Sequence, residues 1–138
     1  MNVIIYGASG MVGRGVLLQS LKATDVEKVV IVVRKSLGLQ HDKLEEIITS
    51  DLNQTEYLEP IQNFDACFYC LGISATGLTE AQYQAVNYDL TIHVANVLVQ
   101  SNPNMTFVYI SGAGTDSTEQ GKIMWARVKG KTENTLSL

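Results

Sequence analysis

The chain has 138 residues, of which 46% are hydrophobic and 17% are charged, a composition typical of a globular domain with a real core. Its formal net charge of −4 argues against a general affinity for nucleic acid or an anionic membrane surface. No stretch approaches the roughly 20 apolar residues of a membrane span. No basic segment ahead of an apolar run opens the chain. We therefore predict a single cytoplasmic domain over residues 1–138.

Strand-like and helix-like patterns alternate from one end of the chain to the other. The predicted elements are strands at 2–6, 28–34, 46–49, 65–71 and 105–111, helices over 11–22, 54–61, 79–101 and 122–136, and a glycine- and serine-rich loop over 112–121. Continuous apolar strands alternating with helices are typical of a parallel sheet covered on both faces. Right-handed crossovers then predict a doubly wound, Rossmann-like α/β fold with strand order 3-2-1-4-5.

Glycines recur at three-residue spacing between the first strand and the first helix. In a dinucleotide-binding turn, Gly7 allows the tight turn, Gly10 lets a pyrophosphate approach, and Gly13 lets helix and strand pack closely. The unpaired N–H groups of the helix N-terminus then hold the phosphates. The alternative is a purely structural turn. The predicted cofactor-binding residues of this segment are Gly7, Ala8, Ser9, Gly10, Met11, Val12, Gly13 and Arg14.

Two basic residues, Arg34 and Lys35, follow the second strand. An acidic residue at this place would bond to the adenosine ribose and repel a 2′-phosphate, whereas basic residues do the opposite. Arg34 can pair with the phosphate, and Arg14 could reach the same group. The pattern therefore favours NADP over NAD, although NAD stays possible. The alternative is that both residues only flank a solvated strand end.

The next two strands also end on candidate cofactor contacts. Asp51 can accept a hydrogen bond from the adenine amino group and Leu52 can pack on the ring, but Asp51 could equally cap the following helix. Cys70, Leu71 and Gly72 follow the fourth strand and are expected to pass beside the cofactor riboses.

The remaining polar residues give weaker signals. Cys67 and Cys70 are three apart in a strand and point to opposite faces, so we predict neither a disulfide nor a shared metal. His41 and His93 have no partners at metal-ligand spacing. Ser111, after the fifth strand, would face the nicotinamide end of a dinucleotide. Lys129 on the last helix is either solvated surface or a cofactor contact.

Together these residues resemble the short-chain dehydrogenase/reductase superfamily, in its extended and atypical, nucleoside-diphosphate-sugar epimerase-like branches. The residues that carry the resemblance are Gly7, Gly10 and Gly13 of a GxxGxxG motif, Asp51, Asn87, Ser111 and Lys129. The resemblance implies a nicotinamide dinucleotide cofactor. It also implies a contact from Lys129 to the cofactor, catalytic roles for Ser111 and Lys129, and a relay water on the Asn87 carbonyl.

The chain departs from that family at two points. Trp125 stands where the YxxxK motif has its Tyr, and an indole N–H cannot act as a general acid or base. The chain also ends before the sixth strand expected of the family, which indicates either a truncated nucleotide-binding half or a minimal domain that uses a partner. Because a sheet edge would then lack its usual cover, we expect a homodimer or reduced stability. Three functions stay open: NADP(H) binding without Tyr-dependent catalysis, an active oxidoreductase or epimerase-like enzyme on an unknown small-molecule substrate, and an interaction module.

Overall fold

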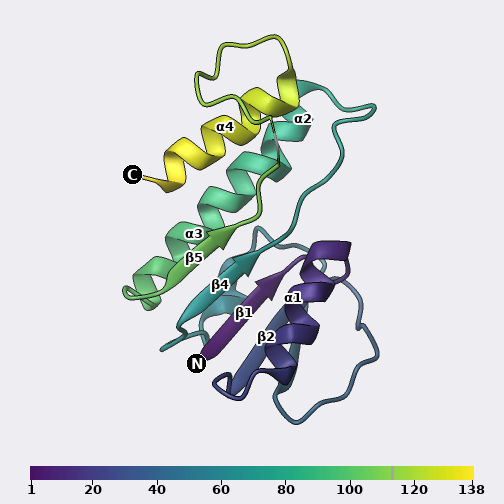
Figure 1. Cartoon of the computed structure of the whole chain (residues 1–138), viewed down its shortest axis with the longest axis vertical. Coiled ribbons are helices and arrows are strands. Elements are labelled where there is room, and N and C mark those ends of the chain that lie inside the picture. The colour runs from purple at the N-terminus through teal and green to yellow at the C-terminus, as the bar shows by residue number, and fades with distance from the viewer. Residues whose placement is uncertain (113) are drawn as a thin grey trace.

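The computed structural model describes residues 1–112 and 114–138; Ala113, in the predicted loop 112–121, lies outside the described residues. Its strands form one parallel sheet in the order β3-β2-β1-β4-β5 (Figure 1). The strands are β1 (Asn2–Tyr6), β2 (Lys28–Val33), β3 (Leu44–Ile48), β4 (Ala66–Tyr69) and β5 (Thr106–Tyr109). The predicted doubly wound fold and its strand order are confirmed.

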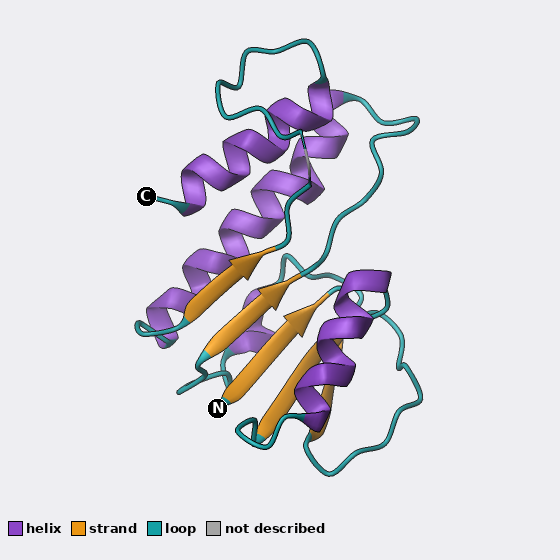
Figure 2. Cartoon of the chain, in the orientation of Figure 1, coloured by secondary structure: helices purple, strands orange, loops and turns teal. Residues whose placement is uncertain are grey.

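Helices lie on both faces of this sheet (Figure 2). They are α1 (Met11–Lys22), the 3₁₀ helix η1 (Thr55–Leu58), α2 (Glu80–Gln84), the π turn η2 (Ala85–Asp89), α3 (Leu90–Ser101) and α4 (Met124–Leu136). On one face, Val3 and Ile5 of β1 pack with Leu17 of α1. On the other, Ile4 packs in a core cluster with Val94 of α3. Alternate residues of one strand thus bury both faces, as a parallel sheet requires.

Two helical segments differ from the prediction. The helix expected over 54–61 is the single 3₁₀ turn Thr55–Leu58, because Pro60 follows and cannot continue the backbone hydrogen bonding. The helix expected over 79–101 begins at Glu80 with a capping box between Thr79 and Gln82. It runs to Ser101 but contains the π turn η2. Apolar periodicity gives no signal for one inserted residue.

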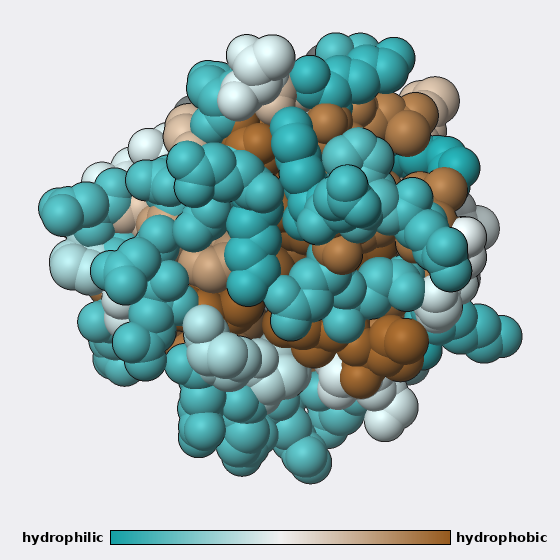
Figure 3. Space-filling view, turned by 90° about the horizontal axis from the view of Figure 1, so that it is seen from below, coloured by the Kyte–Doolittle hydropathy of each residue, from teal (hydrophilic) through white to brown (hydrophobic). Residues whose placement is uncertain are grey.

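The last helix, α4, packs beside α2, η2 and α3 (Figure 1). Every strand pairs in parallel with its neighbour, so all strands end at the same edge of the sheet, as the arrows of β1, β4 and β5 show in Figure 1. Figure 3 looks at the molecule from below, where hydrophilic side chains cover much of the face and hydrophobic ones show between them. Within the described residues, no helix combines the length and apolar character needed to cross a membrane.

Candidate functional site

A cleft of about 480 Å³ opens at the carboxyl ends of β1 and β2. Ligands of doubly wound sheets bind at this edge, where the strand order reverses. The predicted contacts Arg34, Lys35, Leu52 and Leu71 all lie in its wall. Its lining residues are Gly7, Ala8, Ser9, Val32, Val33, Arg34, Lys35, Ser36, Leu37, Leu52, Leu71 and Ile73. The fold thus brings seven predicted residues to one cleft, whereas Gly10, Asp51, Cys70 and Gly72 are not among its described lining residues.

The floor of the cleft is the glycine turn between β1 and α1. Gly7 has a φ of +79°, and a Cβ there would lie 2.6 Å from the carbonyl carbon of Cys70. A Cβ on Gly13 would lie 2.0 Å from the carbonyl oxygen of Gly7. No real side chain fits at such distances. Gly7 and Gly13 are therefore required by the packing of α1 against β1 and β4.

Gly10 stands in a different situation. Its φ is −79°, which any residue adopts, and the nearest atom to an added Cβ is the Gly7 carbonyl oxygen at an ordinary 3.5 Å. Gly10 caps α1 without any side-chain hydrogen bond, and the first turn of α1 carries no acidic residue. The helix end keeps its positive dipole and unpaired N–H groups, and glycine at this position leaves room for a close ligand. These residues fit a bound pyrophosphate.

Three further residues of the predicted segment lie at the start of α1. Met11 is 90% exposed, and Val12 and Arg14 are exposed as well. Arg34 and Lys35 are among the described residues that line the cleft, and Arg14 is not. The positive charge in the wall of the cleft therefore comes from the segment that follows β2.

The segment after β3 holds Asp51 by local bonds. An Asp51 carboxylate oxygen accepts a 3.0 Å hydrogen bond from the Asn53 N–H, and the residue that caps η1 is Gln54. The alternative that Asp51 caps this helix is wrong, because Asp51 lies too far ahead of it and closes an Asx turn instead. Leu52 is buried in the cleft wall. Its carbonyl accepts a hydrogen bond from the Tyr57 hydroxyl.

The segment after β4 passes close to the glycine turn. Cys70 is half-buried and packs against Gly7, and Leu71 lines the cleft. A Cβ on Gly72 would lie 3.2 Å from the side-chain oxygen of Asn87. Glycine at this position lets the segment run past the long helix. Cys67 is buried, and both cysteines are free thiols.

A second polar cluster lies at the carboxyl end of β5, outside the cleft lining. The Ser111 hydroxyl donates a hydrogen bond to a carboxylate oxygen of Glu133, and the Lys129 amine lies 5.6 Å from the centre of the Tyr109 ring. Partial burial lowers the pKa of Lys129, and the nearby Glu133 opposes that shift. Glu133 is not among the residues predicted from the sequence. The available signal was its position one helical turn after Lys129, on the same face of α4.

The π turn presents the backbone of Asn87 to this cluster. Asn87 is 2% exposed, and its carbonyl oxygen accepts hydrogen bonds from the hydroxyls of Thr91 at 3.3 Å and Thr132 at 3.1 Å. Its side chain accepts from the Ile73 N–H and donates to the Tyr83 carbonyl. The carbonyl that the resemblance assigns to a relay water therefore bonds to two protein hydroxyls.

No exposed phenol lies in this cluster within the described part of the chain. Trp125 stands four residues before Lys129 and packs near Gly114. The Tyr109 hydroxyl is buried, and burial raises the pKa of Tyr109 to about 12. A hydroxyl that is enclosed and so weakly acidic is a poor proton donor at neutral pH.

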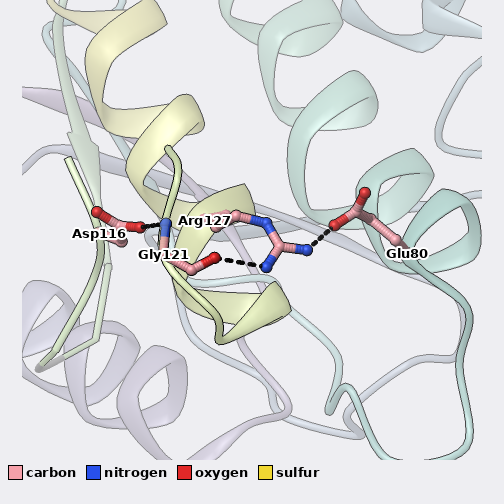
Figure 4. A network of polar contacts seen from close by, with 4 residues as sticks. All are labelled: Glu80, Asp116, Gly121 and Arg127. Atoms are coloured by element: carbon pink, nitrogen blue, oxygen red, sulfur yellow. Dashed lines mark hydrogen bonds and ion pairs between the residues drawn. The ribbon is translucent and has the colours of Figure 1, made fainter. Parts of the chain in front are cut away.

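The loop after β5 is tied to two helices (Figure 4). The Gly121 N–H donates to the Asp116 carboxylate at 2.6 Å, and Arg127 of α4 donates to the Gly121 carbonyl at 2.8 Å and pairs with Glu80 of α2. Hydrogen bonds from the Thr118 hydroxyl and, next, from the Gly121 N–H hold the pKa of the Asp116 carboxyl below its usual range. The part of the chain that the structure describes contains no cluster of three or more His, Cys, Asp or Glu placed to hold a metal ion.

A protein-family model described as the NAD dependent epimerase/dehydratase family matches residues 3–122. Leucinostatins biosynthesis cluster protein T of Purpureocillium lilacinum is 28% identical over 122 residues, which are 86% of this chain and 45% of that protein. Protein FMP52, mitochondrial, of Candida glabrata is 28% identical over 134 residues, 96% of this chain and 55% of that protein. The chain spans about half the length of these curated relatives.

Among solved structures, UDP-glucuronic acid 4-epimerase from Bacillus cereus, in complex with NAD, superimposes with a TM-score of 0.73 at 18% identity. The superposition covers 99% of this chain and 52% of that chain. The likeness shows the shared fold, and the family match confirms the resemblance read from the motifs.

The prediction of a cytoplasmic location is wrong by the same comparison, because FMP52 relatives are named as mitochondrial proteins. The prediction rests on two features: apolar stretches too short for a membrane span, and an opening segment without a basic run ahead of an apolar one. Neither feature of a folded domain encodes its compartment.

Proposed function

The chain belongs to the NAD dependent epimerase/dehydratase family, and on that premise we propose that it binds NADP(H) in the cleft at the ends of β1 and β2. The observation that carries the proposal is Gly10, a glycine that neither its backbone conformation nor its protein neighbours require. It is the N-cap residue of α1, a helix end without a side-chain capping hydrogen bond and without an acidic residue in its first turn. A bound pyrophosphate accounts for all of these features.

Each part of the dinucleotide has a proposed set of partners. The first turn of α1 holds the pyrophosphate, and Leu52 and Leu71 pack beside the adenine. Arg34 and Lys35 bind the 2′-phosphate, which favours NADP over NAD. Strands β1 and β5 are two strand spacings, about 10 Å, apart at this edge. The nicotinamide end therefore reaches toward Ser111 and Lys129.

We propose further that this chain lacks the Tyr-dependent proton transfer implied by the YxxxK motif. When bound, the nicotinamide ring supplies the redox chemistry, and the protein must move a proton at the substrate oxygen. Trp125 cannot do so, and the Tyr109 hydroxyl is buried. The lost Tyr therefore favours cofactor binding without that form of catalysis.

An active oxidoreductase or epimerase-like enzyme is the second candidate function, and one observation favours it. The Ser111 hydroxyl already donates to the Glu133 carboxylate, so its oxygen is left to accept a hydrogen bond from a substrate hydroxyl. Lys129, one turn from Glu133, would favour charge developing on the substrate oxygen.

A calorimetric titration of the chain with NADPH tests the binding proposal. The variant Gly10→Asp places a side chain and a negative charge at the pyrophosphate position, and we expect it to abolish measurable binding. A thermal melt of the same variant reports whether it is folded. Binding of equal strength by the folded variant would overturn the proposed site.

A further inference from the structure

One carboxylate folds the segment after β2 back against β3. Glu46 lies on β3, and one of its oxygens accepts a 2.6 Å hydrogen bond from the Ser36 hydroxyl. Its other oxygen accepts a 2.8 Å hydrogen bond from the Leu37 N–H. Ser36 and Leu37 follow Lys35 directly and, like Lys35, line the cleft. The two carboxylate oxygens of Glu46 therefore bind the Ser36 hydroxyl and the Leu37 N–H, next to the proposed 2′-phosphate site.

The same turn is fixed from its other side. The Ser36 hydroxyl also accepts a 3.1 Å hydrogen bond from the Gly38 N–H, and Gly38 has a φ of +70°. Leu37 packs against the core cluster that contains Leu17 of α1. Ser36 therefore stands at the centre of a chain of contacts that begins at Glu46 and ends at Gly38.

We propose that Glu46 is a positioning residue for cofactor selection. By fixing Ser36 and Leu37, it holds the preceding Arg34 and Lys35 at the mouth of the cleft, where they meet the 2′-phosphate of NADP(H). This inference rests on the proposed function. Arg34 and Lys35 are long, exposed side chains, and a fixed backbone lowers the entropy that they lose when they bind a phosphate.

The alternative is that Glu46 competes with the phosphate as a negative charge in the same place. Two donors already bond to its oxygens, and bonds to an ionised acceptor are the strong kind. These donors hold the pKa of Glu46 below its usual range, so the carboxylate stays ionised at neutral pH. An ionised carboxylate with one donor on each oxygen is suited to ordering the segment. When the charge of Glu46 is removed, the positioning role predicts a weaker preference for NADPH over NADH, and the competing role predicts a stronger one.

The neighbouring residue Glu45 is a matched control. It lies on the same strand with the same charge, but successive strand residues point to opposite faces. Glu45 is exposed and pairs with Lys28 at 3.0 Å. Glu45→Gln therefore changes the net charge by the same amount as Glu46→Gln and leaves the segment after β2 untouched.

The experiment measures NADPH and NADH dissociation constants for the wild-type chain and for Glu46→Gln, Ser36→Ala and Glu45→Gln, with a thermal melt of each. For Glu46→Gln we expect NADPH binding to weaken roughly fivefold or more while NADH binding stays within about twofold. Ser36→Ala removes only one exposed hydroxyl and shifts the ratio of the NADPH and NADH dissociation constants in the same direction. Glu45→Gln keeps the wild-type ratio of these two constants.

Three results would overturn the inference. An unchanged ratio in Glu46→Gln and Ser36→Ala would show that other contacts fix the segment. A ratio that rises in favour of NADPH would show that Glu46 competes with the phosphate. Equal losses for both dinucleotides with a lower melting temperature would leave Glu46 a role in folding alone. The wild-type titrations test the proposed function itself. If the wild-type chain shows no preference for NADPH over NADH, both the proposed function and this inference are contradicted.

Discussion

The hydroxyl of Thr132 on α4 donates a 3.1 Å hydrogen bond to the carbonyl oxygen of Asn87, in the π turn η2. The same hydroxyl reaches the Val128 carbonyl at 2.8 Å, and Thr132 is fully buried. An inserted residue in a helix shifts its hydrogen bonds and frees a carbonyl for other donors. This bond therefore links the helix that carries Lys129 to the long helix beside the sheet.

Replacing Thr132 tests the strength of this link. Thr132→Val keeps the shape but removes the hydroxyl, so we expect the free energy of unfolding to fall by about 1–3 kcal/mol. The matched control is Thr106→Val, an exposed position on β5, which we expect to stay within about 0.5 kcal/mol of the wild type. Urea unfolding followed by circular dichroism measures both. Equal stability of the two variants would contradict the role assigned to Thr132.

The glycines of α1 give a second pair of variants. A Cβ on Gly13 meets the Gly7 carbonyl oxygen at 2.0 Å, whereas a Cβ on Gly15 meets nothing within 4 Å. We expect Gly13→Ala to lower the free energy of unfolding by about 2 kcal/mol or more, since the backbone must move. We expect Gly15→Ala to raise it by about 0.5–1 kcal/mol, because alanine favours the helix. A stable Gly13→Ala chain would show that α1 packs less closely on β1 than described.

A third prediction concerns the choice of dinucleotide. Arg34→Asp places a negative charge in the cleft wall, so we expect the preference for NADPH over NADH to fall at least about tenfold and to reverse if Arg34 dominates it. Arg14→Asp makes the same change of charge on α1, away from the cleft lining. We expect a smaller change in the preference from that variant. A larger effect from Arg14 than from Arg34 would move the phosphate site to the start of α1.

The buried Tyr109 hydroxyl predicts how stability changes with pH. It has no hydrogen-bond partner among the described residues, although Thr132 lies beside it. Tyr109→Phe removes an unpaired buried group, so we expect the free energy of unfolding at pH 7 to rise by about 1 kcal/mol. Burial raises the pKa of Tyr109 from 10.0 to about 12. The folded chain therefore keeps a proton that the unfolded chain releases between these values, and stability is lost as the pH rises through this window.

Urea unfolding at several pH values measures this effect. The loss of stability between pH 10 and pH 12 should be smaller in Tyr109→Phe than in the wild type. The loss does not vanish, because burial also raises the pKa values of Tyr6 and Tyr69. A variant less stable than the wild type at pH 7 would show that the hydroxyl is bonded after all.

Sequence patterns predicted the features that depend on local chemistry. The strand order follows from apolar runs alternating with helices, and the turn at Gly7 and Gly13 follows from spacing, because only glycine fits both places. Arg34 and Leu52 were expected in one site because parallel strands end at one edge, and the cleft contains both.

Contacts between distant segments were beyond sequence reasoning. Glu46 was assigned only to a strand, yet its partners lie on the loop nine and ten residues earlier. The helical spacing places Glu133 near Lys129, but its bond to Ser111 depends on how α4 packs at the end of β5. The π turn gave no periodic signal, although it frees the carbonyl that Thr132 binds. Each of these depends on which surfaces meet, and a single sequence does not record that.

The most direct test of the account is a side-by-side titration of the wild-type chain with NADPH and NADH, using nicotinamide fluorescence with thermal melts in parallel. The account predicts saturable binding of both dinucleotides, with NADPH tighter because Arg34 and Lys35 lie in the cleft wall. Binding of neither dinucleotide by a folded chain would contradict it. The glycine turn would then be a structural connection between β1 and α1 and nothing more.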